Sequence, residues 1–190
     1  MRSAKQHDFV LDLGCGDGGH LPYVADRSHY IGLDIDKPSL VKLRRNHPET
    51  CVVRGNAFQL PIRSASVPCL VNIYNLEHLV YLDLALEKMA RVLSPEGDCF
   101  VSVPCEGGAF WSLGRKATSA RHFNSPTFDY EHAVELEHVN CIWQLDRSLT
   151  RHFRVLKRVL FPLHLPTFHL NLVATYHLVQ RPVGSADAHD

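Results

Sequence analysis

The sequence predicts a doubly wound α/β fold built on a mainly parallel sheet. Through residues 9–103, short apolar segments alternate with segments whose apolar residues recur at helical spacing. The first apolar segment runs directly into a glycine-rich turn, in the stretch VLDLGCGDGG. Near the C-terminus, two apolar segments are joined by the short, proline-containing link FPLHLPT, which suits an antiparallel pair better than a helical crossover. Alternation of this kind implies right-handed crossovers between parallel strands.

Five strands and three helices are expected in the first half of the chain. The expected strands are Phe9–Leu13, Tyr30–Leu33, Cys51–Val53, Val67–Tyr74 and Cys99–Val103. The expected helices cover about residues 18–27, 37–47 and 79–93. Asp36 has the character of an N-cap, and Pro38 falls in the first helical turn, where proline is tolerated. The Ser-Pro-Glu-Gly turn at 94–97 is expected to end the third helix.

The second half begins with a polar, aromatic-rich segment, residues 104–150, that breaks the alternation. We expect it to be an insertion near the strand ends, helical over about residues 128–149. Two strands, Phe153–Leu160 and Phe168–Val179, should follow as an antiparallel pair. Residues 1–182 are therefore expected to form a single domain, with a flexible tail over residues 183–190.

Composition limits the function classes. The chain has 190 residues, of which 45% are apolar and 21% charged, as in soluble globular proteins. Lys and Arg together number 20, as do Asp and Glu, and this balance argues against a nucleic-acid binder. No apolar run is long enough to span a membrane, and the N-terminus does not resemble a signal peptide. Six scattered cysteines without a CxxC pair favour buried free thiols, so we expect a cytoplasmic protein.

The turn after the first strand indicates the class of ligand. Gly14, Gly16 and Gly19 satisfy the GxGxxG pattern of dinucleotide sites. Asp12 precedes the first glycine by two residues, and its carboxylate is expected to point into the crevice and repel a diphosphate. Asp17 adds a second acid within the loop. These charges favour a nucleoside with a positive group and no phosphate, and S-adenosylmethionine has that chemistry.

Polar residues follow the next strands at the same edge of the expected sheet. Asp34 ends the second strand, where an acidic side chain can accept from ribose hydroxyls. Asn56 follows the third strand and could read the edge of an adenine. Asn75 follows the fourth. Because ligands of open α/β sheets bind at the carboxyl ends of the strands, these side chains are expected in one crevice.

Taken in order, VLDLGCGDG, YIGLDID, GNAFQLPI, NLEHL and SPEGDCFVSVP resemble the motifs of the class I S-adenosylmethionine-dependent methyltransferases, specifically their type 11 small-molecule branch. The resemblance covers about residues 9–103. It implies a Rossmann-like seven-stranded sheet of order 3-2-1-4-5-7-6 with an antiparallel last strand. It also implies S-adenosyl-L-methionine as cofactor and the following cofactor-binding residues: Asp12, Gly14, Cys15, Gly16, Asp34, Ile35, Asn56, Ala57 and Asn75.

The chain departs from this family at two points. Asn56 stands where the family usually has aspartate, but its carbonyl oxygen can still accept from an amine. Only eight residues precede Phe9, whereas family members often carry N-terminal helices that cover the cofactor. We therefore expect that residues 104–150, a second copy of the chain or another protein covers the site, or that the site stays open and binds the cofactor weakly.

The acceptor side offers fewer signals. His78 follows the fourth strand and is the candidate general base for a hydroxyl acceptor, although Glu77 and His78 could instead cap and pack the next helix. Tyr74 stands where related quinone methyltransferases have an acidic metal ligand, so no metal is expected. The insertion carries polar residues at positions where the family binds its acceptor: Arg121, His122, Tyr130, His132, Glu137, His138 and Asn140. A basic cluster over residues 147–158 is a solvated face, a contact for an anionic acceptor or a contact with a membrane surface.

Together these features predict a methyltransferase for a small molecule, acting at a hydroxyl, with a sugar or glycan precursor as one acceptor class. Two alternatives stay open. The chain could be a cofactor-binding but non-catalytic subunit that needs a partner to cover the site. It could also be an NAD-dependent oxidoreductase, which the glycine pattern allows and Asp12 disfavours.

Overall fold

The computed structural model describes residues 9–24, 27–117 and 138–181. Its centre is a seven-stranded sheet of order β3-β2-β1-β4-β5-β7-β6, which confirms the expected order. Strands β1 to β5 pair in parallel, and β7 is antiparallel to both β5 and β6. The strands are β1 (Val10–Leu13), β2 (Tyr30–Asp34), β3 (Cys51–Arg54), β4 (Val67–Ile73), β5 (Leu93–Pro104), β6 (Phe153–Pro162) and β7 (Asn171–Gln180).

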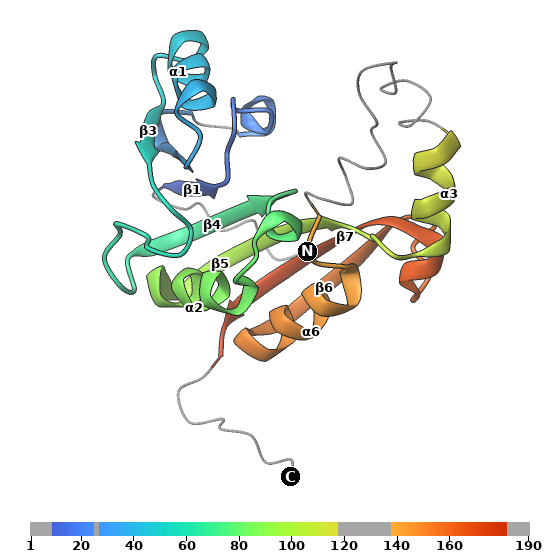
Figure 1. Ribbon diagram of the computed structural model, residues 1–190. Coiled ribbons are helices and arrows are strands. Elements are labelled where there is room, and N and C mark those ends of the chain that lie inside the picture. The colour runs from blue at the N-terminus through green and yellow to red at the C-terminus, as the bar shows by residue number, and fades with distance from the viewer. Residues whose placement is uncertain (1–8, 25–26, 118–137, 182–190) are drawn as a thin grey trace.

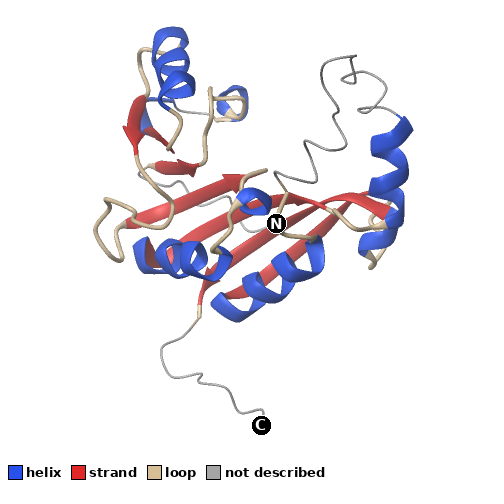
Figure 2. Ribbon diagram, viewed as in Figure 1, coloured by secondary structure: helices blue, strands red, loops and turns tan. Residues whose placement is uncertain are grey.

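Helices flank this sheet, as Figure 2 shows. The α-helices are α1 (Lys37–Asn46), α2 (Leu82–Val92), α3 (Ala109–Ala117) and α6 (Ile142–His152). Within the described residues, 3-10 turns connect several elements: η1 (Leu21–Tyr23), η2 (Arg27–His29), η3 (Leu76–His78) and η4 (Phe168–Leu170). Helices α2 and α6 lie side by side across the half of the sheet that contains β4, β5, β7 and β6 (Figure 1).

Two apolar cores form on the two faces of the sheet. The larger includes Leu11 and Leu13 of β1 and the buried stripe of α2. The smaller includes Tyr30 of β2 and Leu43 of α1. Because side chains alternate along a strand, Asp12 lies on the face opposite to Leu11 and Leu13. This alternation determines which residues of β1 can reach a ligand at the strand's end.

Local structure departs from the sequence-based expectation in several places. The helix expected over residues 18–27 is wrong, because the described part of that segment forms the 3-10 turns η1 and η2, with Gly18 at φ +89°. Strand β5 begins at Leu93, because Leu93 already pairs with Val67 of β4. Residues 94–97 form a bulge before the pairing resumes at Asp98. Helix α3 was not expected from the polar composition of its segment.

The helix expected over residues 128–149 is only partly present. Residues 138–141 are not helical, because the amides of Val139 and Asn140 donate to the carbonyl of Glu77 instead of continuing a helix. The helix α6 begins at Ile142. Residues 128–137 and the expected tail over 183–190 lie outside the described residues.

The fold brings the loops that follow β1, β2, β3 and β4 to one edge of the sheet, since these strands are parallel. Helices long and apolar enough to cross a membrane are absent from the described part of the chain.

Candidate functional site

The turn after β1 requires glycine. Gly14 has φ +77° and Gly16 φ +53°, a region that side-chain-bearing residues rarely adopt. A Cβ atom on Gly14 would lie 2.4 Å from the Asn75 side chain, which comes from the loop after β4. The first glycine therefore permits both the tight turn and the close approach of a second loop.

The amides of this turn are largely used within the protein. The Gly14 and Cys15 amides donate to the Leu33 carbonyl at 2.8 and 3.3 Å. The Gly16 amide donates to Asp34 Oδ2 at 2.8 Å. These three N–H groups are thus not aimed at a ligand, in contrast to turns that cradle a diphosphate.

Asp34 links the turn to the pocket. Its Oδ1 accepts from the Asp36 amide at 2.8 Å, while Oδ2 accepts from Gly16. The side chain is partly exposed and lines the pocket. Because each carboxylate oxygen has two lone pairs, Asp34 retains acceptor capacity for hydroxyl groups of a ligand.

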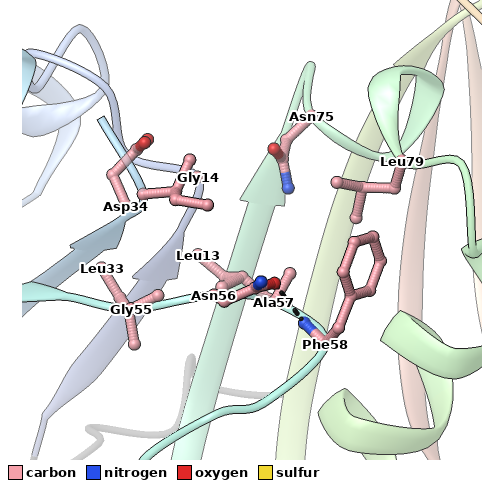
Figure 3. A pocket seen from close by; sticks show the side chains of 11 residues that line it. Leu13, Gly14, Leu33, Asp34, Gly55, Asn56, Ala57, Phe58, Asn75 and Leu79 are labelled. Atoms are coloured by element: carbon pink, nitrogen blue, oxygen red, sulfur yellow. Dashed lines mark hydrogen bonds between the residues drawn. The ribbon is translucent and has the colours of Figure 1, made fainter.

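The pocket itself is small, with a volume of about 110 Å³. Figure 3 shows Gly14 between Asp34 and Asn75 at its rim. Among its lining residues Asp34 is the one charged side chain, and there is no Lys or Arg. The lining residues are Leu13, Gly14, Leu33, Asp34, Ile35, Gly55, Asn56, Ala57, Phe58, Asn75 and Leu79.

Most of this lining is apolar and suits a flat base. Ile35 is 62% exposed and lies at the pocket edge, where a bound ring could cover it. Asn56 Oδ1 accepts from the Phe58 amide at 2.9 Å, the dashed line in Figure 3. Its amide nitrogen is then the group that can donate to a ring nitrogen. The chemistry of the lining fits a nucleoside without phosphates.

Asp12 lies elsewhere. Its side chain is 1% exposed and is not among the residues that line the pocket. Oδ2 accepts from the Tyr30 hydroxyl at 2.8 Å and lies 3.4 Å from Nδ1 of His20. Its hydrogen bond raises the pKa of His20. Within the described part of the chain, Asp12 Oδ1 has no hydrogen-bond partner. A direct contact of Asp12 with the ligand stays a prediction.

Cys15 and Gly16 also lie outside the pocket lining. The Cys15 thiol is buried, and burial, followed by the charges of Asp12 and Asp34, raises its pKa to about 12. At neutral pH this thiol is protonated and unreactive. Cys15 therefore supports the turn through its packing.

The turn η3 carries the acceptor-side candidates. His78 is exposed, and its ring lies edge-to-face against His138 with centroids 4.6 Å apart. Glu77 is 1% exposed, and burial raises the pKa of its carboxyl to about 7. Glu106, which follows β5, pairs with Nδ1 of His138. The structure thus brings one residue of the polar insertion set against the predicted catalytic residue.

Of the other polar residues in the insertion set, the structure describes Asn140. Asn140 donates through Nδ2 to the carbonyls of Leu76 and Leu79 at 3.0 and 2.8 Å, so it anchors η3. Arg121, His122, Tyr130, His132 and Glu137 lie outside the described residues.

Sequence reasoning missed several contributors. Leu13, Leu33, Phe58 and Leu79 line the pocket but read as ordinary apolar residues. Their positions at or just after strand ends were the available signal. Glu106 gave no comparable signal, because its partner lies 32 residues away along the chain.

Part of this chain is similar in sequence to known methyltransferases. Residues 11–101 match the family model described as a methyltransferase domain. A probable S-adenosylmethionine-dependent methyltransferase of Mycolicibacterium smegmatis is 36% identical over 96 residues, covering 50% of this chain and 37% of that protein. A dTDP-3-amino-3,6-dideoxy-alpha-D-glucopyranose N,N-dimethyltransferase of Streptomyces fradiae is 34% identical over 92 residues, covering 46% and 36%. The matched segment thus spans little more than a third of these relatives.

Solved structures share the fold over most of the chain. The PH0226 protein of Pyrococcus horikoshii has a TM-score of 0.68 at 15% identity, covering 93% of this chain and 83% of that one. A Haloferax volcanii putative methyltransferase in complex with the Trm112 methyltransferase activator has a TM-score of 0.64 at 16% identity, covering 93% and 84%.

Proposed function

We infer that this chain, whose residues 11–101 match a methyltransferase-domain family model, is a class I S-adenosylmethionine-dependent methyltransferase that transfers a methyl group to a small-molecule acceptor. One observation carries the proposal. The pocket at the carboxyl ends of the strands has a single carboxylate, Asp34, no basic residue and an apolar lining. Such a lining suits a nucleoside that bears a sulfonium and no phosphate.

We assign different residues of the pocket to different parts of the cofactor. We assign Asp34 to the ribose hydroxyls, because its carboxylate lines the pocket and keeps acceptor capacity. Ile35, Asn56 and Ala57 are assigned to the adenine. Gly14 and Asn75 are assigned to the methionine part, for which the Asn75 amide is a side-chain donor beside the turn. We assign a supporting role in the turn after β1 to three residues that lie outside the pocket lining: Asp12, Cys15 and Gly16.

Bound S-adenosylmethionine supplies an activated methyl group, and the chain's task is to hold an acceptor in line with it. His78 is the proposed catalytic residue. It lies on η3, three residues beyond Asn75, and is exposed. A hydroxyl acceptor must lose a proton as it is methylated, and a neutral imidazole can take it.

A sugar or glycan precursor is the acceptor class that we propose. The dimethyltransferase of Streptomyces fradiae, which is 34% identical over the matched segment, is named for an amino-sugar nucleotide. Its name specifies nitrogen, whereas we propose oxygen for this chain on the position of His78. We further propose a cytoplasmic location, because all six cysteines are free thiols.

A protein partner is the second part of the proposal. A neighbour of the same fold is solved with an activator protein. In the corresponding alternative, the chain binds the cofactor and needs a partner, or a second copy of itself, for turnover. We do not favour the oxidoreductase alternative, because the turn amides are occupied and the residues that line the pocket include no Lys or Arg that could bind a diphosphate.

Calorimetry tests the proposal directly. The purified chain should bind S-adenosylhomocysteine and should not bind NAD. Binding of NAD without S-adenosylhomocysteine would overturn it. Methyl transfer from radiolabelled S-adenosylmethionine to sugar nucleotides, measured with and without a candidate activator, then separates a self-sufficient enzyme from a subunit that needs a partner.

A further inference from the structure

A second constellation lies beside the cofactor pocket. Glu77 and His78 of η3 and His138 each offer one ligand atom, and these atoms lie within 4.8 Å of one another. We propose that these three side chains hold a divalent transition-metal ion, which sequence analysis did not expect. The binding of the ion stands on its own, and its role at the acceptor rests on the proposed methyl transfer.

Backbone contacts hold the ligands together. The Val139 and Asn140 amides donate to the Glu77 carbonyl at 2.9 and 3.2 Å. The Asn140 side chain reaches the carbonyls of the residues on either side of the Glu77–His78 pair. Residue 138 is therefore fixed against η3 by main-chain geometry, and the ligand set is preorganised.

The Glu77 carboxylate independently points to a cation. The side chain is 1% exposed, and its Oε2 has no hydrogen-bond partner within the described residues. A buried carboxylate oxygen without a partner is costly, because it loses its hydration and gains nothing in return. A metal ion between Glu77 and the two imidazoles would supply the missing interaction.

His138 has the supporting contact that metal-binding histidines usually have. Its Nδ1 pairs with a carboxylate oxygen of Glu106. In metal sites, one ring nitrogen typically donates to a carboxylate, which fixes the ring and leaves the other nitrogen for the ion. Glu106 is itself held in place, because the Ile142 amide donates to its carbonyl at 3.1 Å.

The ligand types indicate which ion fits. Two imidazoles and one carboxylate are typical of zinc sites that keep an open coordination position, whereas Mg²⁺ and Ca²⁺ prefer all-oxygen ligands. The open position can take an oxygen of the acceptor, since Asn75 of the cofactor pocket and His78 lie on the same short turn. While the ion is bound, His78 is a ligand, so the role of base proposed for His78 applies to the metal-free protein.

The test uses the full chain after treatment with a chelator. Titration with Co²⁺, followed by its visible absorption, and calorimetry with Zn²⁺ should each give one ion per chain. The variants His78→Gln and His138→Gln should bind at least tenfold more weakly. Glu106→Gln, which removes only the supporting carboxylate, should weaken binding by about tenfold. His169→Gln, an exposed histidine outside the cluster, should bind like the parent.

S-adenosylhomocysteine binding is measured on the same samples. His78 is exposed, so its variant should keep its fold, its melting temperature and its affinity for S-adenosylhomocysteine. Failure of the parent to bind Co²⁺ and Zn²⁺, or unchanged ion affinity in both histidine variants, overturns the metal proposal and leaves the cofactor proposal standing. Ion binding without S-adenosylhomocysteine binding would support the metal proposal and overturn the cofactor proposal.

Discussion

Substitution of Asp34 is the sharpest test of the cofactor site. In the structure the carboxylate accepts from two backbone amides and still faces the pocket. Asp34→Ala would remove the only charge of the pocket lining and both acceptors proposed for the ribose hydroxyls. Hydrogen bonds to a charged group contribute about 1.5–3 kcal/mol each. Because the side chain is partly exposed, we use the lower end, about 3 kcal/mol for two bonds, or roughly a hundredfold in affinity.

Asp34→Asn is the informative companion. Each carboxylate oxygen accepts from a backbone N–H, so the amide nitrogen of asparagine must face one of these donors in either orientation. The variant should lose its hydrogen bond with either the Gly16 or the Asp36 amide and bind about tenfold more weakly, which corresponds to about 1.4 kcal/mol. A result between those of parent and alanine is therefore expected.

The assay is calorimetric titration with S-adenosylhomocysteine, and Asp17→Asn is the matched control. Asp17 lies in the turn after β1, next to the Gly16 that Asp34 contacts, and it is exposed and pairs with Lys42. Asp17→Asn should leave the affinity for S-adenosylhomocysteine within about twofold of the parent, because a solvated charge contributes little to binding. The reasoning fails if Asp34→Ala binds within threefold of the parent. It also fails if Asp17→Asn loses as much as Asp34→Ala, since general negative charge would then explain the site.

Three further predictions concern the turn and its surroundings. Gly14→Ala should weaken S-adenosylhomocysteine binding more than tenfold and lower the melting temperature. The new Cβ atom would lie 2.4 Å from the Asn75 side chain, and the backbone φ of +77° is strained for alanine. Gly19→Ala is the control and should change neither quantity, because a Cβ atom there has nothing within 4 Å. Asp12 raises the pKa of His20, so this pair stabilises the fold fully below the ordinary histidine pKa of 6.5 and loses that contribution as pH rises through the folded pKa. Urea unfolding from pH 5.5 to 8.5 should show this loss in the parent relative to His20→Gln, and a constant difference would contradict it. Brief iodoacetamide treatment at pH 7.5 should modify exposed Cys51 and spare Cys15, whose pKa is raised to about 12, and equal modification of both in peptide mass spectra would refute this.

Most strand positions and the antiparallel final pair were predictable from sequence because their signals are local, whereas the order of the strands in the sheet was implied by the resemblance to a known family. Apolar segments, the glycine turn after β1 and the short link between β6 and β7 each constrain only neighbouring residues. The position of Asp34 followed in the same way, since a residue that ends a parallel strand lies at the ligand-binding edge. The structure places Asp34 in the pocket lining.

Asp12 shows where the same reasoning reaches its limit. It lies inside β1, paired with Gly32 and Val71, and alternation turns it to the face opposite to Leu11 and Leu13. Its nearest polar group is the Tyr30 hydroxyl of the adjacent strand, a contact that depends on strand register. Distance along the chain from the first glycine did not reveal that register.

The acceptor side was less predictable because its contacts are distant in sequence. His138 meets η3 only because Val139 and Asn140 donate to the Glu77 carbonyl, more than 60 residues away along the chain. The helical spacing of the segment gave the opposite expectation for residues 138–141. The polar side chains of this segment therefore did not predict its conformation.

The turn η3 relates the two proposed sites to each other. Its N-cap residue, Asn75, lines the cofactor pocket, and its last residue, His78, belongs to the proposed metal cluster. Tyr74, immediately before it, has φ +52°, a conformation that costs energy for a residue with a side chain and that surrounding contacts must enforce. The Asn140 amide provides such contacts, because it binds the carbonyls of Leu76 and Leu79. A reaction that requires in-line transfer benefits from this arrangement, since one rigid turn then sets the position of the acceptor relative to the cofactor.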